Sequence, residues 1–165
     1  MIRYRTVDSP IGPLTLAGEG SVLTHLRMVD QTYAPNHADW VSDDRAFPDA
    51  VDQLQAYFAG QRTAFELQLD LHGSQFYRRV WGALLTIPYG ETRSYGEIAR
   101  QIGAPGAARA VGLANGRNPI AIVVPCHRVI GVSGGLTGYG GGLDRKRALL
   151  ELERRGMSTS MTLFD

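Results

Sequence analysis

The spacing of apolar residues changes at residues 72–74, and this change limits the folds open to the chain. Before it, residues 65–71 alternate apolar and polar side chains, which is typical of a half-buried strand. After it, apolar residues recur at helical spacing from Phe76 to Leu85. A chain of 165 residues can hold two small domains. We therefore expect an N-terminal α/β support domain over residues 1–72 and a mainly helical domain over residues 75–165.

The N-terminal region should combine short strands with one helix. Apolar residues between Ala50 and Phe58 follow the helical repeat, and Gly60 stands where a helix commonly ends. Residues 30–45 have the character of an irregular acidic loop. Strands are predicted at residues 2–8, 14–16, 22–29 and 65–71. None of these elements carries a pattern that points to chemistry.

Two short helices after residue 90 resemble a helix-turn-helix. Ser94 and Glu97 form a capping box that opens the first, and Gly103 stops it. Pro105 begins the second, which should run to about Gly116. Such a pair in a basic region is typical of DNA-binding proteins, although many helical hairpins bind no DNA.

The second of these helices has an unusual surface for a DNA reader. Arg109 is its only long side chain, whereas readout in the major groove needs several Asn, Gln or Arg side chains. Small residues can instead approach the narrow minor groove closely, or simply permit tight packing inside the protein. The small residues include Gly106, Ala107, Ala108, Ala110, Val111, Gly112 and Ala114.

The chain beyond this helix contains its only cysteine. Residues 120–124 are uniformly apolar and are predicted to form a strand, which leads into Pro125 and Cys126. A glycine-rich stretch covers residues 131–142. A last helix is predicted over residues 144–155, with Asp144 as its N-cap.

Composition excludes several classes of protein. Hydrophobic residues make up 44% and charged residues 20%, which is normal for a folded globular chain. No apolar run is long enough for a transmembrane helix, and the N-terminus lacks the apolar region of a secretory signal. One cysteine permits no internal disulfide and suits a reducing compartment, so we expect a cytoplasmic protein without a membrane association. The four scattered histidines do not suggest a metal site.

Charge is distributed unevenly along the chain. Residues 1–74 carry 5 Arg against 10 Asp and Glu, whereas residues 75–155 carry 11 Arg and 1 Lys against 5 acidic residues. A basic second half favours contact with a polyanion. Chance clustering on solvated faces would give the same numbers, so charge alone leaves both interpretations open.

Cys126 has neighbours that suit a reactive thiol. Most lone cysteines are small buried hydrophobes, and a free thiol is only slightly ionised at neutral pH. A nearby base or cation raises the thiolate fraction, and His127 and Arg128 follow directly in the sequence. Adjacent residues on a strand point to opposite faces, so His127 could act on Cys126 only through a turn at Pro125 or a bridging water.

Asn118-Pro119 is followed, six residues later, by the run Pro125-Cys126-His127-Arg128-Val129. This pattern resembles the active-site signature of the O6-alkylguanine-DNA alkyltransferases, and the resemblance covers about residues 75–155. It continues through Gly90-Glu91, Ser94-Tyr95, residues 107–112, Gly138-Tyr139, Leu149-Leu150 and Glu153. The family implies a ribonuclease-H-like α/β N-terminal domain and a C-terminal winged helix-turn-helix domain that binds DNA and accepts the alkyl group.

The resemblance implies roles for the residues near the cysteine. Cys126 would be the acceptor nucleophile, His127 a base acting through a water, and Glu153 the group that orients that histidine. Asn118 would be the hinge between the second helix and the active-site strand. Arg128 would be a structural ion-pair residue.

The resemblance also implies roles in binding DNA. Arg109 would replace an extruded base, with Ala110 and Gly112 close to the minor groove. Tyr95 would push on the flanking phosphate and hydrogen-bond the departing guanine. The pocket for the flipped base would be lined by Tyr95, Val129, Tyr139 and Gly140.

Three features of this sequence narrow what the resemblance implies about metals, the base pocket and the kind of family member. Some members bind zinc through N-terminal cysteines, which this chain lacks, so we expect neither a metal nor another cofactor. Gly140 stands where other members can have serine, which leaves only its backbone for a contact. The presence of Cys126 excludes the non-catalytic damage sensors, and the chain length leaves no room for a regulatory domain.

The expected reaction is a single transfer per protein molecule. The alkyl group would pass from O6 of guanine, and less well from O4 of thymine, in double-stranded DNA to Cys126 after minor-groove binding and base flipping. We expect a monomer whose cooperativity on DNA the sequence leaves open. Two alternatives remain: a DNA-binding regulator without chemistry, and a hydrolase of the Cys-His type.

Overall fold

The computed structural model describes residues 1–29, 31, 35–131 and 142–164, with side chains as far as residue 157. Its N-terminal part is a four-stranded sheet in the order β3-β2-β1-β4. β1 pairs antiparallel with β2 and parallel with β4, and β2 pairs antiparallel with β3. The strands are β1 (Arg3–Val7), β2 (Leu14–Glu19), β3 (Val22–Met28) and β4 (Val41–Ser42). The three long strands match the sequence prediction, whereas β4 lies in a region expected to be an irregular loop.

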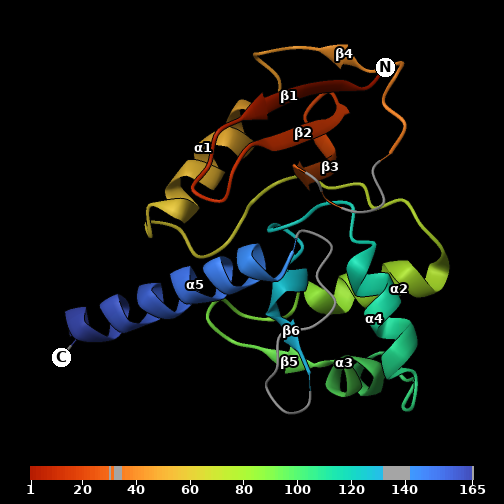
Figure 1. Ribbon diagram of the computed structural model, residues 1–165, viewed down its shortest axis with the longest axis vertical. Helices are drawn as coiled ribbons and strands as arrows, with labels where there is room; N and C mark the ends of the chain where they lie inside the picture. The colour runs from red at the N-terminus through yellow and green to blue at the C-terminus, as the bar shows by residue number, and fades with distance from the viewer. Residues whose placement is uncertain (30, 32–34, 132–141, 165) are drawn as a thin grey trace.

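The helix α1 (Pro48–Phe58) lies beside this sheet (Figure 1). Its buried face consists of Ala50, Val51, Leu54 and Tyr57, as the helical spacing predicts. The strand predicted at residues 65–71 is wrong as a regular element. It makes one isolated parallel bridge, between Leu23 and Leu69, although its side chains do alternate between half-buried and exposed. Alternating burial shows only that one face of this segment packs against the protein. A single bridge to β3 is enough to place that face inward.

The C-terminal part is mainly helical. Its helices are α2 (Gln75–Leu84), α3 (Tyr95–Gln101), α4 (Ala108–Gly116) and α5 (Leu143–Phe164). Ser94 and Glu97 form the complete capping box that the sequence predicts, and Ser74 caps α2 by accepting a hydrogen bond from the Tyr77 backbone N–H. The N-cap predicted at Asp144 is wrong, because Asp144 lies in the first turn of α5. Two short strands, β5 (Arg93–Ser94) and β6 (Val129–Ile130), pair in parallel.

α3 and α4 form the predicted helix-turn-helix. Gly103 lies in the turn with φ of 76°, a left-handed conformation that glycine adopts without steric cost. α4 begins at Ala108, three residues after the predicted start. Trp81 of α2 donates a hydrogen bond of 2.8 Å to the Ala114 carbonyl, which holds α4 against the domain. Because β5 leads directly into α3 and pairs with β6, the motif begins beside the residues that follow Cys126.

The strand predicted at residues 120–124 is wrong. Only Ile120 pairs, with Leu26 of β3, and the chain then turns tightly, with Ile122 at φ of 70°. Cys126–Arg128 form a short 3₁₀ helix, η1. The segment is apolar because both halves of the protein bury it. By composition alone, an irregular segment that is buried on all sides looks the same as a buried strand. A branched residue at positive φ is strained, and its location just before the cysteine is typical of functional sites.

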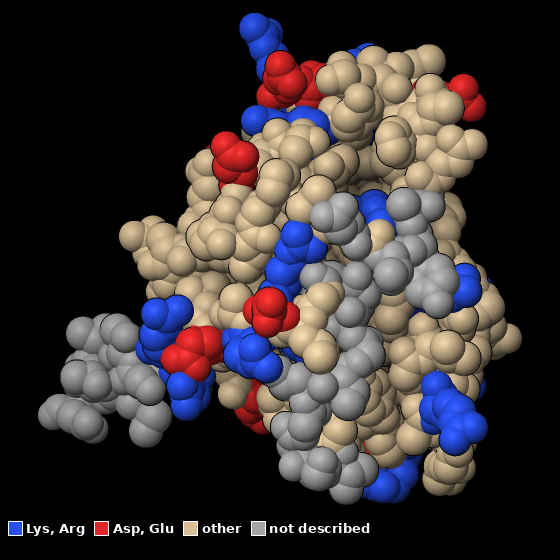
Figure 2. Space-filling view, viewed as in Figure 1, with Lys and Arg blue, Asp and Glu red and all other residues tan. Residues whose placement is uncertain are grey.

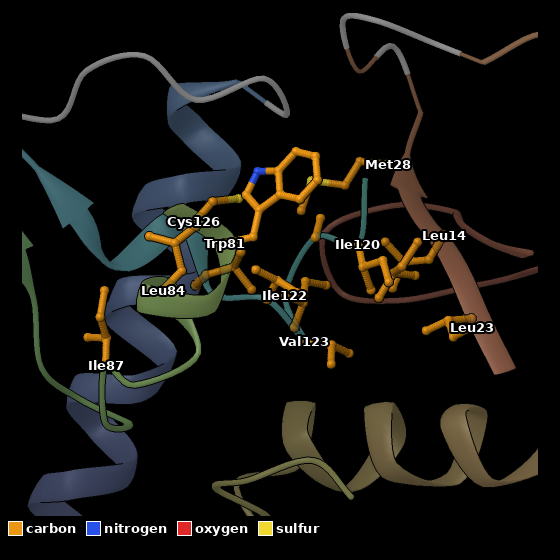
Figure 3. Packing of buried hydrophobic residues seen from close by; sticks show 14 of the residues in the cluster. Leu14, Leu23, Met28, Trp81, Leu84, Ile87, Ile120, Ile122, Val123 and Cys126 are labelled. Atoms are coloured by element: carbon orange, nitrogen blue, oxygen red, sulfur yellow. The ribbon is translucent and has the colours of Figure 1, made fainter. Parts of the chain in front are cut away.

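One buried cluster joins the two halves of the protein. Figure 3 shows Leu14, Leu23 and Met28 of the sheet at one side and Trp81 and Leu84 of α2 at the other. Ile120, Ile122 and Val123 lie between them. In Figure 1, α5 lies below α1 and runs toward the C-terminus on the side away from α3 and α4. It is longer than predicted, starting at Leu143 and ending at Phe164. The division at residues 72–74 into separately folding domains therefore stays a prediction.

Candidate active site

Cys126 stands at the first position of η1, inside the buried cluster. Its residue is 4% exposed, and its backbone N–H donates to the Val124 carbonyl at 2.8 Å. Pro125, with φ of −81° and ψ of 64°, ends the extended direction of the chain. A turn at Pro125, one of the two routes that the sequence left open, is therefore present, and the side chains of Cys126 and His127 do not alternate across a strand.

His127 is held by the carboxylate of Glu153 on α5. The distance from His127 Nε2 to Glu153 Oε2 is 2.6 Å, and the two side chains are 0% and 1% exposed. The other ring nitrogen, Nδ1, is buried and has no hydrogen-bond partner in the structure. Since an ionised carboxylate only accepts, Nε2 must carry the proton that binds Glu153. In the neutral ring, Nδ1 is then the free acceptor.

Five hydrogen bonds converge on the Glu153 carboxylate. Oε2 accepts from His127, from the Tyr57 hydroxyl at 2.6 Å and from Arg128 Nη2 at 2.9 Å. Oε1 accepts from Arg128 Nε at 2.8 Å and from the Gly90 backbone N–H at 3.3 Å. The ion pair expected of Arg128 is thus confirmed, and it is bidentate. A buried carboxylate that accepts this many donors is held in one position.

The protonation states follow from burial and from these contacts. Burial alone would raise the pKa of Glu153, but the hydrogen bonds and charges of His127 and Arg128 outweigh it and hold that pKa well below its usual range. Burial lowers the pKa of His127 more strongly than Glu153 raises it. The resting site therefore contains an ionised Glu153, a charged Arg128 and a neutral imidazole, which can act as a base.

Lys146 is a residue of this site that the sequence analysis missed. It is the only lysine of the chain and is 0% exposed, and its ammonium donates to the Val129 carbonyl at 2.5 Å. Burial lowers its pKa to about 8, while the negative charge of the Cys126 thiolate acts in the opposite direction. A signal was present: Lys146, Leu149 and Glu153 share one face of α5 at helical spacing. A cation beside the thiol favours the thiolate.

Two asparagines connect α4 to the cysteine segment. Asn118 donates to the Val124 carbonyl at 2.8 Å and accepts from the Ile120 N–H at 3.0 Å, so it shapes the turn that follows α4. Asn115, which the sequence analysis missed, donates from the end of α4 to the Cys126 carbonyl at 3.2 Å. The connection predicted for Asn118 alone is therefore divided between two side chains.

The residues proposed to meet DNA lie on α3 and α4. Arg109 and Ala110 are exposed, and Tyr95 is half-buried at the first position of α3. Gly112 faces Tyr95, because a Cβ added there would lie 3.8 Å from two atoms of the tyrosine ring. Val129 is buried in β6, whereas Tyr139 and Gly140 lie outside the described residues. Val129 lies in β6, which pairs with β5, and Tyr95 directly follows β5. The rest of the predicted pocket lies outside the described residues.

On the face drawn in Figure 2, basic side chains lie at several separate places on the C-terminal half. Along α5 they alternate with acidic ones, where Arg147 pairs with Asp144 and Arg154 with Glu151. Arg109 has no ion pair among those found in the described part of the chain. Its charge is therefore available to an external anion.

Among residues 1–29, 31, 35–131 and 142–164, no group of three or more His, Cys, Asp or Glu side chains is placed to bind a metal ion. No helix in these ranges combines the length and the apolar character needed to cross a bilayer.

Comparison with protein families finds matches to both halves of the chain. Residues 2–71 match the ribonuclease-like domain of 6-O-methylguanine DNA methyltransferase. Residues 75–155 match the DNA binding domain of the same family.

Individual relatives agree with this match. The chain is 73% identical over 165 residues to a methylated-DNA–protein-cysteine methyltransferase of Mycobacterium bovis, with all of both chains covered. It is 53% identical over 151 residues to the methyltransferase of that name from Methanosarcina acetivorans, covering 91% of this chain and 97% of the other. The crystal structure of Mycobacterium tuberculosis OGT in complex with DNA shares 71% identity, with a TM-score of 0.91 and 99% of each chain covered.

The buried carboxylate makes stability depend on pH in a predictable direction. Because its folded pKa is lowered, the ionisation of Glu153 stabilises the protein fully above the ordinary pKa of about 4.3. That contribution is lost as the pH falls from there through the lowered folded value. Glu153→Gln should lower the free energy of unfolding at pH 7 by about 3 kcal/mol or more, since it leaves Arg128 buried without its partner. The difference from wild type should shrink below pH 4.

Glu151→Gln is the matched control on the same helix. Its ion pair with Arg154 is partly exposed, at 42% and 75%, so its loss should cost about 1 kcal/mol or less. Urea unfolding at several pH values measures both variants. Equal losses for Glu151→Gln and Glu153→Gln would contradict the assignment of Glu153 as the buried anchor.

Proposed function

Since the chain belongs to the 6-O-methylguanine DNA methyltransferase family and acts in DNA repair as a methylated-DNA–protein-cysteine methyltransferase, we propose that Cys126 is its alkyl acceptor. The alkyl group comes from O6 of guanine and, less readily, from O4 of thymine. The observation that carries the proposal is the orientation of His127, whose Nε2 binds Glu153 and whose Nδ1 is buried and without a partner next to the only cysteine in the sequence.

The chemistry is a nucleophilic substitution at the alkyl carbon. His127 accepts the Cys126 proton at Nδ1 through a bridging water, and Glu153 stabilises the imidazolium that forms. The thiolate sulfur then bonds to the carbon while the bond from that carbon to O6 breaks. Guanine leaves with the electron pair, is proposed to accept a hydrogen bond from the Tyr95 hydroxyl as it departs, and takes up a proton from water. The cation of Lys146 favours the thiolate throughout.

The product explains why one protein molecule acts once. A thioether carbon is not an acyl carbon, so water does not displace the sulfur as it does from a thioester. The alkylated protein is therefore a stoichiometric end product.

The first test is the mass of the protein after reaction. Incubation with a duplex that contains O6-methylguanine should add about 14 Da, one methyl group replacing a proton, to Cys126 alone. Intact-protein mass spectrometry with peptide mapping measures this. Cys126→Ser should remain unmodified and still bind the duplex.

Two results would oppose the acceptor assignment. Repair with an unmodified Cys126, or several turnovers per molecule, would favour a hydrolase of the Cys-His type. Specific DNA binding with neither repair nor a mass change would favour a regulator without chemistry.

Binding to DNA is proposed to use the minor groove and base flipping. The exposed surface of α4 offers Arg109 and Ala110, which can approach a narrow groove without a clash. The alkylated atom is inaccessible in a stacked duplex, so the base must leave the stack to reach Cys126. Contacts to phosphates supply most of the affinity, which makes binding by the monomer independent of sequence and sensitive to salt.

Arg109→Ala tests the flipping role directly. Arg109 is proposed to fill the space of the flipped base and offset part of an unstacking cost of a few kcal/mol. The variant should repair duplex DNA at least about tenfold more slowly than wild type. Its reaction with free O6-benzylguanine, which needs no flipping, should be unchanged. Single-turnover rates with the two substrates measure this.

Arg147→Ala provides a control, because Arg147 is an exposed arginine on α5 already paired with Asp144. It should leave both rates as in wild type. If Arg109→Ala lowers both activities by the same factor, the flipping role fails. If it changes only the salt dependence of binding, Arg109 is a phosphate contact.

A further inference from the structure

We propose that Tyr57 of the N-terminal helix α1 is a positioning residue of the alkyl-transfer site, acting through its hydrogen bond to Glu153. The hydroxyl donates to the same carboxylate oxygen that binds His127, Oε2, at 2.6 Å. This extends the proposed function above and rests on it. The N-terminal half then supplies part of the proton relay, besides serving as a support for the C-terminal half.

The position of the Tyr57 ring is defined by its neighbours. Tyr57 is 0% exposed, and its ring meets Phe58 and Tyr89 edge-on at centroid distances of 5.3 and 6.2 Å. A third ring, Phe65, lies at 5.4 Å. Tyr89 belongs to the C-terminal half, so packing between the two halves helps to orient the Tyr57 hydroxyl toward Glu153. A buried hydroxyl that is fixed in this way loses little freedom when it binds the carboxylate.

The hydroxyl of Tyr57 is a permanent donor. Burial and the negative charge of Glu153 raise its pKa far above the ordinary value, so the phenol stays protonated. An ionised carboxylate oxygen can only accept. His127 and Tyr57 therefore donate to one oxygen, and each weakens the attraction of that oxygen for the other's proton.

This sharing sets the strength of the relay base. The groups that face Glu153 are Tyr57 from α1, Tyr89 from the loop after α2, and His127 and Arg128 from η1. Lys146, on the face of α5 that carries Glu153, adds a positive charge near His127. Arg128 and Lys146 differ from Tyr57 because they are basic side chains, and Tyr89 makes no hydrogen bond to Glu153 in the described structure. Besides His127 itself, Tyr57 is thus the uncharged side chain that donates to Glu153 in the described structure, and its loss changes the carboxylate without changing the net charge.

Tyr57→Phe should move the pH profile of alkyl transfer. Without the hydroxyl, the carboxylate is more basic and binds the imidazolium of His127 more tightly, which raises the pH at which His127 loses its proton. The acidic limb of the rate profile should shift upward by about one pH unit, the size expected for one hydrogen bond to a charged group. On that limb the rate falls about tenfold, and at high pH it approaches the wild-type rate.

The experiment measures single-turnover transfer from free O6-benzylguanine to Cys126 between pH 5 and 9, which removes DNA binding from the result. Tyr89→Phe is the control. It removes a hydroxyl from the neighbouring ring, but that hydroxyl makes no hydrogen bond to Glu153 in the described structure. Thermal unfolding of both variants establishes that each is folded. In the Glu153→Gln background, Tyr57→Phe should have no further effect on the profile.

The outcomes separate this inference from the function on which it rests. A wild-type protein that never alkylates Cys126 refutes the function itself. Normal wild-type transfer with superimposable Tyr57→Phe and wild-type profiles refutes the role of Tyr57. So does a uniform loss of rate at every pH, which a purely structural hydroxyl would give, and so does an undiminished effect in the Glu153→Gln background.

Discussion

The Glu153 carboxylate is the contact on which the rest of the site depends. A buried charge is costly unless charged and hydrogen-bonding partners surround it, and this one accepts from Arg128, His127, Tyr57 and the Gly90 backbone. These donors come from α1, from the loop after α2 and from η1, so one side chain of α5 connects three separate parts of the chain. The same contacts keep His127 in the tautomer that leaves Nδ1 free.

Sequence reasoning recovered the elements that local chemistry dictates. The capping box at Ser94, the face of α1 and the helix-turn-helix all follow from residue spacing. It failed where tertiary packing decides. The apolar run at residues 120–124 forms turns between the two halves of the protein. It was mistaken for a strand because burial on every side selects the same apolar residues as a buried strand. The side chains of residues 65–71 alternate in burial as those of a strand do, but the segment forms only one β-bridge in the described structure.

The chemistry near Cys126 was predictable because several of its groups are neighbours in the sequence. Cys126, His127 and Arg128 are consecutive, and Glu153 was proposed from the resemblance. Tyr57 and Lys146 were not found, since each looks like an ordinary position on an amphipathic helix and acquires a role only when the helices pack. Asn115 was missed for the same reason. Local signals locate a nucleophile, whereas the groups that tune it come from distant parts of the chain.

The central claim is that the contact between Glu153 and His127 makes Cys126 reactive. The most direct measurement is the single-turnover rate of alkyl transfer at neutral pH, compared with affinity for the same duplex, for wild type, His127→Ala and Glu153→Gln. The account predicts a rate loss of about 100-fold or more in both variants, the range for removal of a general base, with unchanged affinity. Wild-type rates in either variant would contradict it and would assign the reactivity of Cys126 to another group.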